Sequence, residues 1–215
     1  MIDMKKLIFS ECTLALLDET FQLNPMFEHE TLQDWLTMPV EITPIEKQIL
    51  ELYQNKIKIY GHDWNEFELK QHFIGPMFAL VDFSSKKFGM FAERSFSGTV
   101  EDIEMSGNPD GIIASGFRKP KQPYFCFQEY KRQTDPKGDP GGQCLAAMLV
   151  AQEMNDNRHT VYGCYIIGIN WYFMTLANKQ YCISNSYLVT RNDIFEVFRI
   201  LKSLKQIVID LIEKK

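Results

Sequence analysis

One apolar segment near the middle of the chain, residues 124–131 (YFCFQEYK), most constrains the fold. Its aromatic residues are typical of a β-strand, and a strand this apolar is expected in the centre of a sheet. Alternate residues of a strand share a face, so we expect Phe125, Phe127, Glu129 and Lys131 on one side. Because burying a carboxylate and an ammonium without partners is costly, the two charges indicate a functional site at the end of this strand.

Helices and further strands are predicted on both sides of this segment. Residues 43–46 (TPIE) carry a helix capping box with proline at the first helical position, and Pro76 is expected to kink or break the second helix. Hydrophobic periodicity predicts helices over 43–60, 65–82, 141–155 and 192–213, short helical pieces near 11–20 and 29–37, and strands over 88–94, 99–105, 111–115, 124–131, 161–168, 171–177 and 181–184. This order predicts an α/β fold in which a mixed central sheet is flanked by helices.

The composition is that of one soluble domain. A chain of 215 residues with 45% hydrophobic residues can bury a full core. We expect a single domain over 1–215, with an N-terminal helical extension over 1–60, a core over 61–185 and a C-terminal amphipathic helix over 190–215. The net charge of −5 argues only weakly against a nucleic-acid partner, since an enzyme needs just a local basic surface.

The cysteines and the apolar runs predict the cellular environment. The chain has five cysteines, an odd number, and none forms a CxxC pair. Such cysteines are expected to be free in a reducing compartment, so we expect a cytoplasmic protein. No apolar run is long enough to cross a bilayer, which excludes a membrane-spanning protein. The histidines have no zinc-like spacing with a cysteine or another histidine.

A second carboxylate is expected beside the first. Pro109 and Asp110 open the apolar strand over 111–115, and this strand and the strand over 124–131 are close enough in sequence to be neighbours. That pairing would place Asp110 near Glu129. Two carboxylates and a backbone carbonyl, here that of Tyr130, are typical oxygen ligands of Mg²⁺. The residues therefore predict a magnesium site at the ends of two adjacent strands.

This pattern resembles the PD-(D/E)XK nuclease superfamily. Pro109-Asp110 is followed nineteen residues later by Glu129-Tyr130-Lys131. The chain contains five Asp/Glu-x-Lys triplets, but only this one ends an apolar strand, and Pro-Asp occurs once. The likeness covers about residues 65–177. The order of a helix with glutamate, strands, Pro-Asp, a strand with Glu-x-Lys and a helix with glutamine strengthens it.

Two helices extend the resemblance. The helix from residue 65 is similar in texture to the first core helix of type I restriction nuclease domains, whose inward glutamate joins the metal site; here that residue is Glu66. Gln143 matches the first position of the Gln-x-x-x-Tyr motif of RecB-like members. Ala147 stands where the tyrosine is expected, so the motif is only half present.

The resemblance implies a restriction-endonuclease-like fold and hydrolysis of phosphodiester bonds in DNA or RNA, with DNA ahead of RNA. The cofactor would be Mg²⁺, with Mn²⁺ as a substitute. Lys131 would orient the attacking water or stabilise charge on the phosphate, and Gln143 would contact substrate or Lys131. The implied metal ligands are Asp110, Glu129, the carbonyl of Tyr130 and Glu66, and the implied phosphate contacts are Arg118, Lys119, Lys121 and Arg132.

Less specific interpretations compete with this one. Asp110 could simply start a strand, and Glu129 with Lys131 could form an ion pair on a solvated edge strand. Glu66 could be there because an acid is favoured near a helix N-terminus. The cluster over 118–121 is more often a solvated turn than a binding site. The alternative for the whole chain is a nuclease fold without catalysis, used as a binding or scaffold module with a protein partner or as a homodimer.

Overall fold

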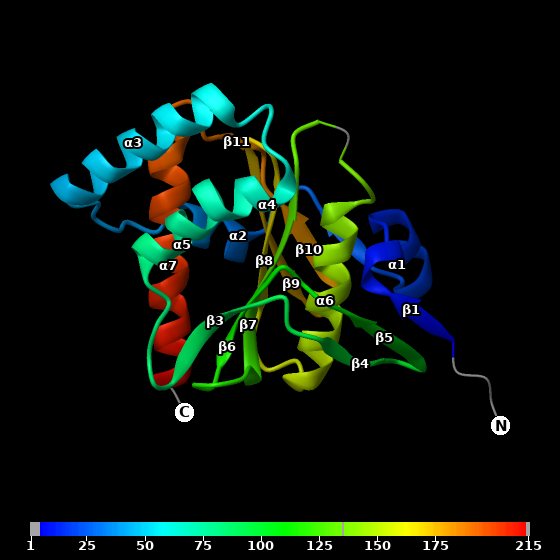
Figure 1. The fold of residues 1–215 in the computed structure, drawn as a ribbon. Helices are drawn as coiled ribbons and strands as arrows, with labels where there is room; N and C mark the ends of the chain where they lie inside the picture. The colour runs from blue at the N-terminus through cyan, green and yellow to red at the C-terminus, as the bar shows by residue number, and fades with distance from the viewer. Residues whose placement is uncertain (1–4, 135, 214–215) are drawn as a thin grey trace.

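The computed structural model describes residues 5–134 and 136–213. Its centre is a mixed eight-stranded sheet in the order β2–β10–β9–β8–β7–β6–β3, with β11 paired to β9 (Figure 1). The pairs β7–β8 and β2–β10 are parallel and the others are antiparallel. The strands are β2 (Asn24–Met26), β3 (Phe88–Ala92), β6 (Gly111–Ser115), β7 (Lys121–Lys131), β8 (Val161–Ile167), β9 (Asn170–Ala177), β10 (Gln180–Ile183) and β11 (Tyr187–Leu188).

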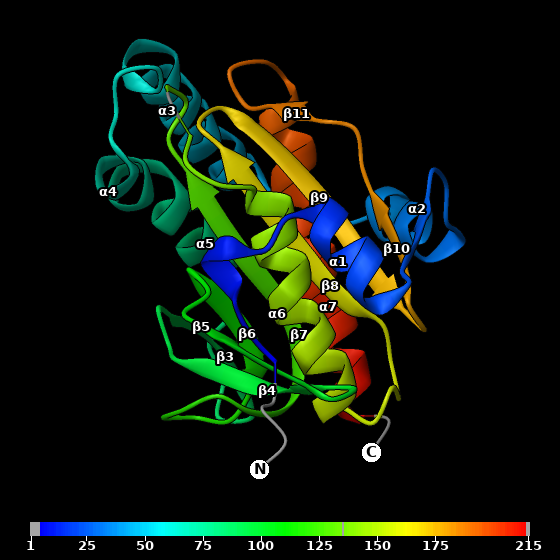
Figure 2. The same ribbon diagram turned by 90° about the vertical axis from the view of Figure 1, so that its right-hand side faces the viewer.

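Helices cover both faces of this sheet, so the predicted α/β class with a mixed, helix-flanked sheet is confirmed. Helix α6 lies on one face and α7 on the other (Figure 2). Helix α1 packs beside α6, whereas α2, α3 and α5 pack against α7. The helices are α1 (Leu14–Phe21), α2 (Glu30–Thr37), α3 (Pro44–Tyr60), α4 (Glu66–Leu69), α5 (Gly75–Val81), α6 (Pro140–Met154) and α7 (Asp193–Glu213), with a 3₁₀ turn η1 (Phe9–Glu11) and a π turn η2 (Lys70–Ile74).

The sheet separates two hydrophobic cores. The larger core lies between the sheet and the helices around α7, and it contains all three tryptophans, Trp35, Trp64 and Trp171. The second core lies under α6 and includes Phe127 of β7 and Phe21 of α1. The strand β7 contributes to both, which explains why its central residues 124–127 are all hydrophobic.

A second, three-stranded sheet packs near α6 in the order β1–β5–β4. Its strands are β1 (Lys6–Ile8), β5 (Ile103–Gly107) and β4 (Phe96–Val100). The single strand expected over 99–105 is wrong, because Glu101 has a left-handed φ of 52° and a turn at 101–102 divides it into the hairpin β4–β5. Figure 1 shows this sheet beside the lower half of α6.

The N-terminal region is not the purely helical extension expected over 1–60. The helices expected near 11–20 and 29–37 are present as α1 and α2, and α3 begins at the predicted capping box. However, β1 pairs in parallel with β5, and β2 pairs in parallel with β10. These strands have three residues each, too few for an alternating pattern to reveal them. Residues 1–4 and 214–215, at the ends of the predicted segments, lie outside the described residues.

A β-bulge in β7 corrects the expected face of Phe125. The register between β6 and β7 shifts between Ile113 and Ala114, and Phe125 has no partner opposite it in β6. The extra residue reverses the alternation of side chains at that point. Phe125 therefore packs in the core around α7, whereas Phe127 packs in the core under α6. The prediction that both rings share a face was wrong.

Candidate active site at the end of strand β7

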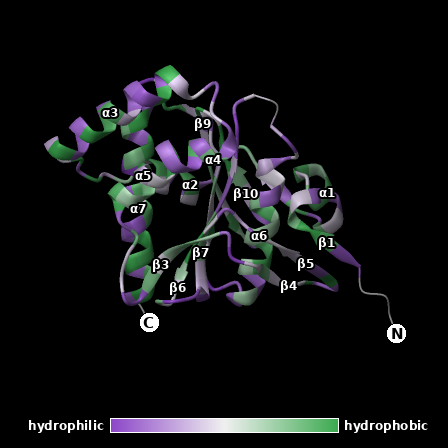
Figure 3. Ribbon diagram, in the orientation of Figure 1, coloured by the Kyte–Doolittle hydropathy of each residue, from purple (hydrophilic) through white to green (hydrophobic). Residues whose placement is uncertain are grey.

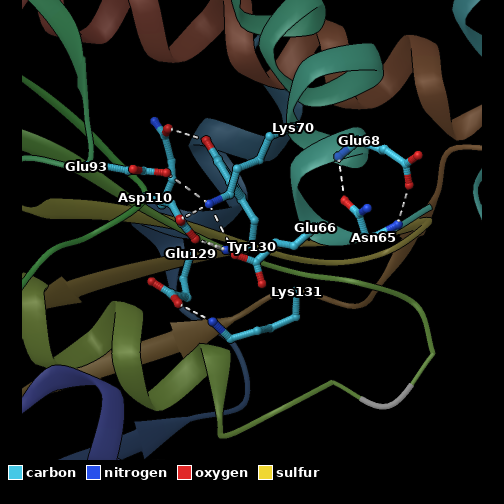
Figure 4. A network of polar contacts seen from close by, with 10 residues as sticks. Asn65, Glu66, Glu68, Lys70, Glu93, Asp110, Glu129, Tyr130 and Lys131 are labelled. Atoms are coloured by element: carbon cyan, nitrogen blue, oxygen red, sulfur yellow. Dashed lines mark hydrogen bonds and ion pairs between the residues drawn. The ribbon is translucent and has the colours of Figure 1, made fainter.

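Both predicted carboxylates lie at the carboxyl end of β7 (Figure 4). Asp110 lies directly before β6, and Glu129 and Lys131 are among the last three residues of β7. Strand β7 pairs in parallel with β8. Helix α6 connects these two parallel strands, and its N-terminus lies over the same end of the sheet (Figure 2). In α/β sheets, ligands bind outside the carboxyl ends of the strands. The local topology therefore places the three residues where a site is expected.

The backbone of Tyr130 anchors Asp110. The Tyr130 N–H donates to Asp110 Oδ2 at 2.7 Å. The pairing of β6 with β7 begins at Gly111, which lies opposite Gln128. Tyr130 lies beyond this last pair, and its N–H bonds to the Asp110 side chain instead of to a backbone carbonyl of β6. The N–H and carbonyl of one strand residue point to the same side. The Tyr130 carbonyl therefore points toward Asp110, as a third oxygen ligand would require.

Glu129 and Lys131 form a half-buried ion pair on the α6 side of β7. Lys131 Nζ lies 2.5 Å from Glu129 Oε1, and their side chains are 14% and 11% exposed. Burial and the charge of Asp110 raise the pKa of Glu129 to about 7, although Lys131 acts in the opposite direction. Burial also raises the pKa of Asp110, despite the ammonium beside it. Burial thus favours the neutral form of both carboxyl groups, although each has a lysine partner.

The ammonium beside Asp110 belongs to Lys70, a residue that the sequence did not predict at the site (Figure 4). Lys70 Nζ lies 2.5 Å from Asp110 Oδ1, 3.2 Å from Glu66 and 3.3 Å from Glu93. Burial lowers the pKa of Lys70, but the hydrogen bond and charge of Asp110, joined by Glu66, outweigh it and raise the pKa. A signal existed, because Glu66 and Lys70 have the i, i+4 spacing of a helical ion pair.

Of the six remaining predicted site residues, three line a cleft at this end of the sheet and three lie at the opposite end of β6. Glu66, Gln143 and Arg132 line a cleft of about 530 Å³ that also includes Lys131. Gln143 and Lys131 also line an adjacent hollow of about 330 Å³ that reaches Glu129. Figure 3 shows hydrophilic residues in α4, at this end of the sheet. Residues that the sequence did not single out complete the two walls: Ser10, Asn65, Asn108, Lys137 and Gly138.

The predicted phosphate contacts at residues 118–121 lie at the other end of β6. Arg118 and Lys119 lie in the β6–β7 turn and Lys121 begins β7, whereas Asp110 precedes the first residue of β6. Five strand residues separate the two ends of β6, which corresponds to roughly 16 Å. The structure therefore does not bring these three side chains to the carboxylates, and they cannot contact a phosphate bound at Asp110. A hairpin returns its turn to the opposite end of the strands, so contact of these residues with other phosphates of a nucleic acid stays a prediction.

The donor set fits a hard divalent cation. Among residues 5–134 and 136–213, no three Asp, Glu, His or Cys side chains already converge as a metal cage. Mg²⁺ does not require one, since it keeps several waters and binds through one or two carboxylates. Arg132 and Lys137 add two positive charges to the wall of the same cleft, where ion pairs join four carboxylates and two lysines. These carboxylates and lysines are Glu66, Glu93, Asp110, Glu129, Lys70 and Lys131.

Comparisons with known proteins add no family. No family model matches the sequence, and a search of curated proteins finds none with significant similarity. Within the described part of the chain, no helix is both long enough and apolar enough to cross a membrane.

Proposed function

We propose that this protein is a Mg²⁺-dependent nuclease that hydrolyses phosphodiester bonds of DNA or RNA, with DNA ahead of RNA. The observation that carries the proposal is the anchoring of Asp110 to the Tyr130 N–H, beside the Glu129–Lys131 pair. This arrangement sets two carboxylates, a backbone carbonyl and an ammonium around one end of the sheet. Those are the groups that metal-assisted phosphodiester hydrolysis requires.

The order of the elements supports a restriction-endonuclease-like fold. Along the chain, a helix with Glu66 precedes β3 and β6, Pro109-Asp110 directly precedes β6, Glu129 lies near the end of β7, and α6 carries Gln143. This is the order on which the sequence resemblance rests. The crossover through α6 then returns the chain to β8, parallel to β7. Five free, buried cysteines support the accompanying proposal of a reducing, cytoplasmic environment.

The residues would divide the chemistry among them. A bound Mg²⁺ would lower the pKa of a coordinated water and neutralise charge on the phosphate. Asp110, Glu129 and the Tyr130 carbonyl would hold the ion, with Glu66 at the rim. Lys131 would donate to the attacking water or to a phosphate oxygen. Two further groups at the cleft, Gln143 and Arg132, would bind the nucleic-acid backbone.

Cleavage assays with matched variants test the proposal. Single- and double-stranded DNA and RNA are incubated with the protein and Mg²⁺ or Mn²⁺. Asp110→Asn, Glu129→Gln and Lys131→Met should each lower the cleavage rate by at least about a hundredfold, as expected for loss of a charge-stabilising group. The control is the exposed ion pair of Lys179 and Glu101, also 2.5 Å long. Lys179→Met and Glu101→Gln should cleave like the wild type.

Circular dichroism establishes that each variant is folded. Cleavage that persists unchanged in folded Asp110→Asn protein would place the activity at another site and overturn the assignment. Loss of cleavage in all three site variants, but in neither control, would identify the substrate and the active site together.

One observation favours a second function, a nuclease fold that binds without catalysis. Both buried carboxylates already have a lysine partner, Lys70 for Asp110 and Lys131 for Glu129. A site neutralised by its own lysines can persist without metal. Nucleic-acid binding without cleavage, together with no Mn²⁺ binding in calorimetry, would establish this function instead.

A further inference from the structure

The ammonium of Lys70 connects three elements at the proposed active site (Figure 4). Its nearest partner is Asp110 before β6, at 2.5 Å, and the two others are Glu66 of α4 and Glu93 after β3, at 3.2 and 3.3 Å. A lysine ammonium has three N–H donors, so it can serve all three carboxylates at once. Lys70 therefore ties the first helix of the core to the end of the sheet.

An uncommon backbone turn presents this lysine. Residues Lys70–Ile74 form a π turn between α4 and α5, and the Gly75 N–H donates to the Lys70 carbonyl. A Cβ at position 75 would lie 2.9 Å from that oxygen, so glycine permits the close approach. Pro76 follows and has no N–H to offer a regular helix. Such π turns often lie at functional sites, and this one begins at the residue that contacts Asp110.

The two lysines of the site differ in how they are held. Lys131 follows Glu129 by two residues on one strand, and both side chains share a face. Lys70 instead reaches Asp110 from another element and has two alternative partners. These partners, Glu66 and Glu93, have side chains that are 40% and 67% exposed, whereas the Asp110 side chain is 11% exposed. Lys70 can therefore leave Asp110 and still keep carboxylate contacts nearer to solvent.

We propose that Lys70 is a displaceable counter-ion of the metal site. In the metal-free protein it occupies Asp110 and limits repulsion among the carboxylates. When a divalent cation binds Asp110, Lys70 gives up that contact and stays with Glu66 and Glu93. This inference rests on the proposed function, since it requires that Asp110 is a metal ligand. Lys70 is then a positioning residue that sets the affinity for metal by competing for Asp110.

Replacing Lys70 should change the metal affinity in opposite directions for a competing lysine and for a structural one. A structural lysine would leave the metal affinity unchanged or lower it when replaced, because the site would become less ordered. A competing lysine does the opposite, since its removal frees Asp110 and takes a positive charge away from the cation. Neighbouring charges at 4–6 Å change proton affinities by one to three pKa units. We therefore expect replacement of Lys70 to tighten divalent metal binding by about tenfold or more.

Calorimetric titration with Mn²⁺, without nucleic acid, measures this effect on the full chain. Lys70→Met and Lys70→Gln should both bind Mn²⁺ about tenfold or more tightly than the wild type. Lys70→Arg keeps the charge and should stay near the wild-type affinity. Lys179→Met removes a lysine of an exposed ion pair and should not alter the affinity. Because a tighter ligand stabilises the fold more, Mn²⁺ should also raise the Tm of Lys70→Met by more than that of the wild type.

The outcomes separate the two proposals. If the wild type binds Mn²⁺ and both neutral Lys70 variants bind it equally or more weakly, the counter-ion inference is overturned and the metal site stands. If neither the wild type nor the variants bind Mn²⁺ at millimolar concentration, the metal site itself fails. If one neutral variant does not fold, the other provides the comparison, since methionine removes the polar end of the side chain and glutamine retains an N–H donor for Asp110.

Discussion

The role of Tyr130 can be separated into its backbone and its side chain. The backbone N–H holds Asp110, whereas the hydroxyl donates to Gln128 Oε1 at 2.6 Å in the buried core. Tyr130→Phe removes only the hydroxyl and leaves a buried amide oxygen unsatisfied, which costs about 1–3 kcal/mol. We therefore expect urea denaturation to show this loss of stability, while the cleavage rate and Mn²⁺ affinity stay within about twofold of the wild type.

Tyr124→Phe is the matched control on the same strand. Tyr124 is also buried, but the contacts with Asn155 that fix it are made by its backbone N–H and carbonyl. Its replacement should cost less stability than that of Tyr130. A large fall in Mn²⁺ affinity in Tyr130→Phe would show that the hydroxyl acts in the site, contrary to the assignment of the backbone.

At the residue scale, the sequence predicted the groups that belong to the chain's local pattern. Glu129 and Lys131 stand out because they are charges in an apolar strand, and Asp110 because it opens the neighbouring strand. Lys70 carries no such contrast, since it lies on a polar-rich helix, and its partners at Asp110 and Glu93 are distant in sequence. Contacts of that kind follow from packing, which a single sequence does not reveal.

At the scale of elements, the cap of α3 predicts how stability depends on pH. Burial raises the pKa of Glu46, but the Thr43 N–H and the Lys202 ammonium outweigh it and lower the pKa below its ordinary value of 4.5. The ionised carboxylate therefore stabilises the fold above pH 4.5, and this contribution is lost as pH falls through the lowered pKa. Glu46→Gln should be less stable than the wild type at pH 7, and the difference should shrink toward pH 3.

Urea midpoints measured from pH 3 to pH 7 test this prediction. Glu51→Gln on the same helix is the control, because Glu51 is exposed, and its difference from the wild type should not vary in the same way. Glutamine also suits the third position of a capping box, so the substitution mainly removes the charge. A constant difference between Glu46→Gln and the wild type across this range would contradict the assignment.

Elements with long, periodic patterns were predicted, whereas the strands of three residues were not. The capping box and the apolar stripe located α3 and α7 almost to the residue. In contrast, β1 and β2 have three residues each, and they exist because β5 and β10 offer free edges to pair with. The bulge at Phe125 was also hidden, since it depends on the register between two strands rather than on either sequence.

At the scale of the whole molecule, the N-terminal region packs into both sheets and into the core under α6. It adds a strand to each sheet, and Phe21 of α1 is 1% exposed in the core under α6. All three tryptophans lie in the other core, around α7. If the chain folds as a single cooperative domain, damage at Phe21 must reach the tryptophans across the sheet. Their fluorescence therefore reports whether the segment with β1, α1 and β2 unfolds together with the distant core, in which all three tryptophans lie.

Phe21→Ala should lower the free energy of unfolding by about 3–5 kcal/mol, as expected for removal of a buried phenyl ring. Phe27→Ala is the control, since Phe27 is 100% exposed only six residues later and should change stability by about 0.5 kcal/mol or less. Urea titrations followed by tryptophan fluorescence and by circular dichroism should give the same shifted midpoint for Phe21→Ala. A fluorescence midpoint that stays at the wild-type value would mean that the segment with β1, α1 and β2 unfolds on its own. In that case β1, α1 and β2 would be an accessory to the core, and the site residue Ser10 would be held only by a separable segment.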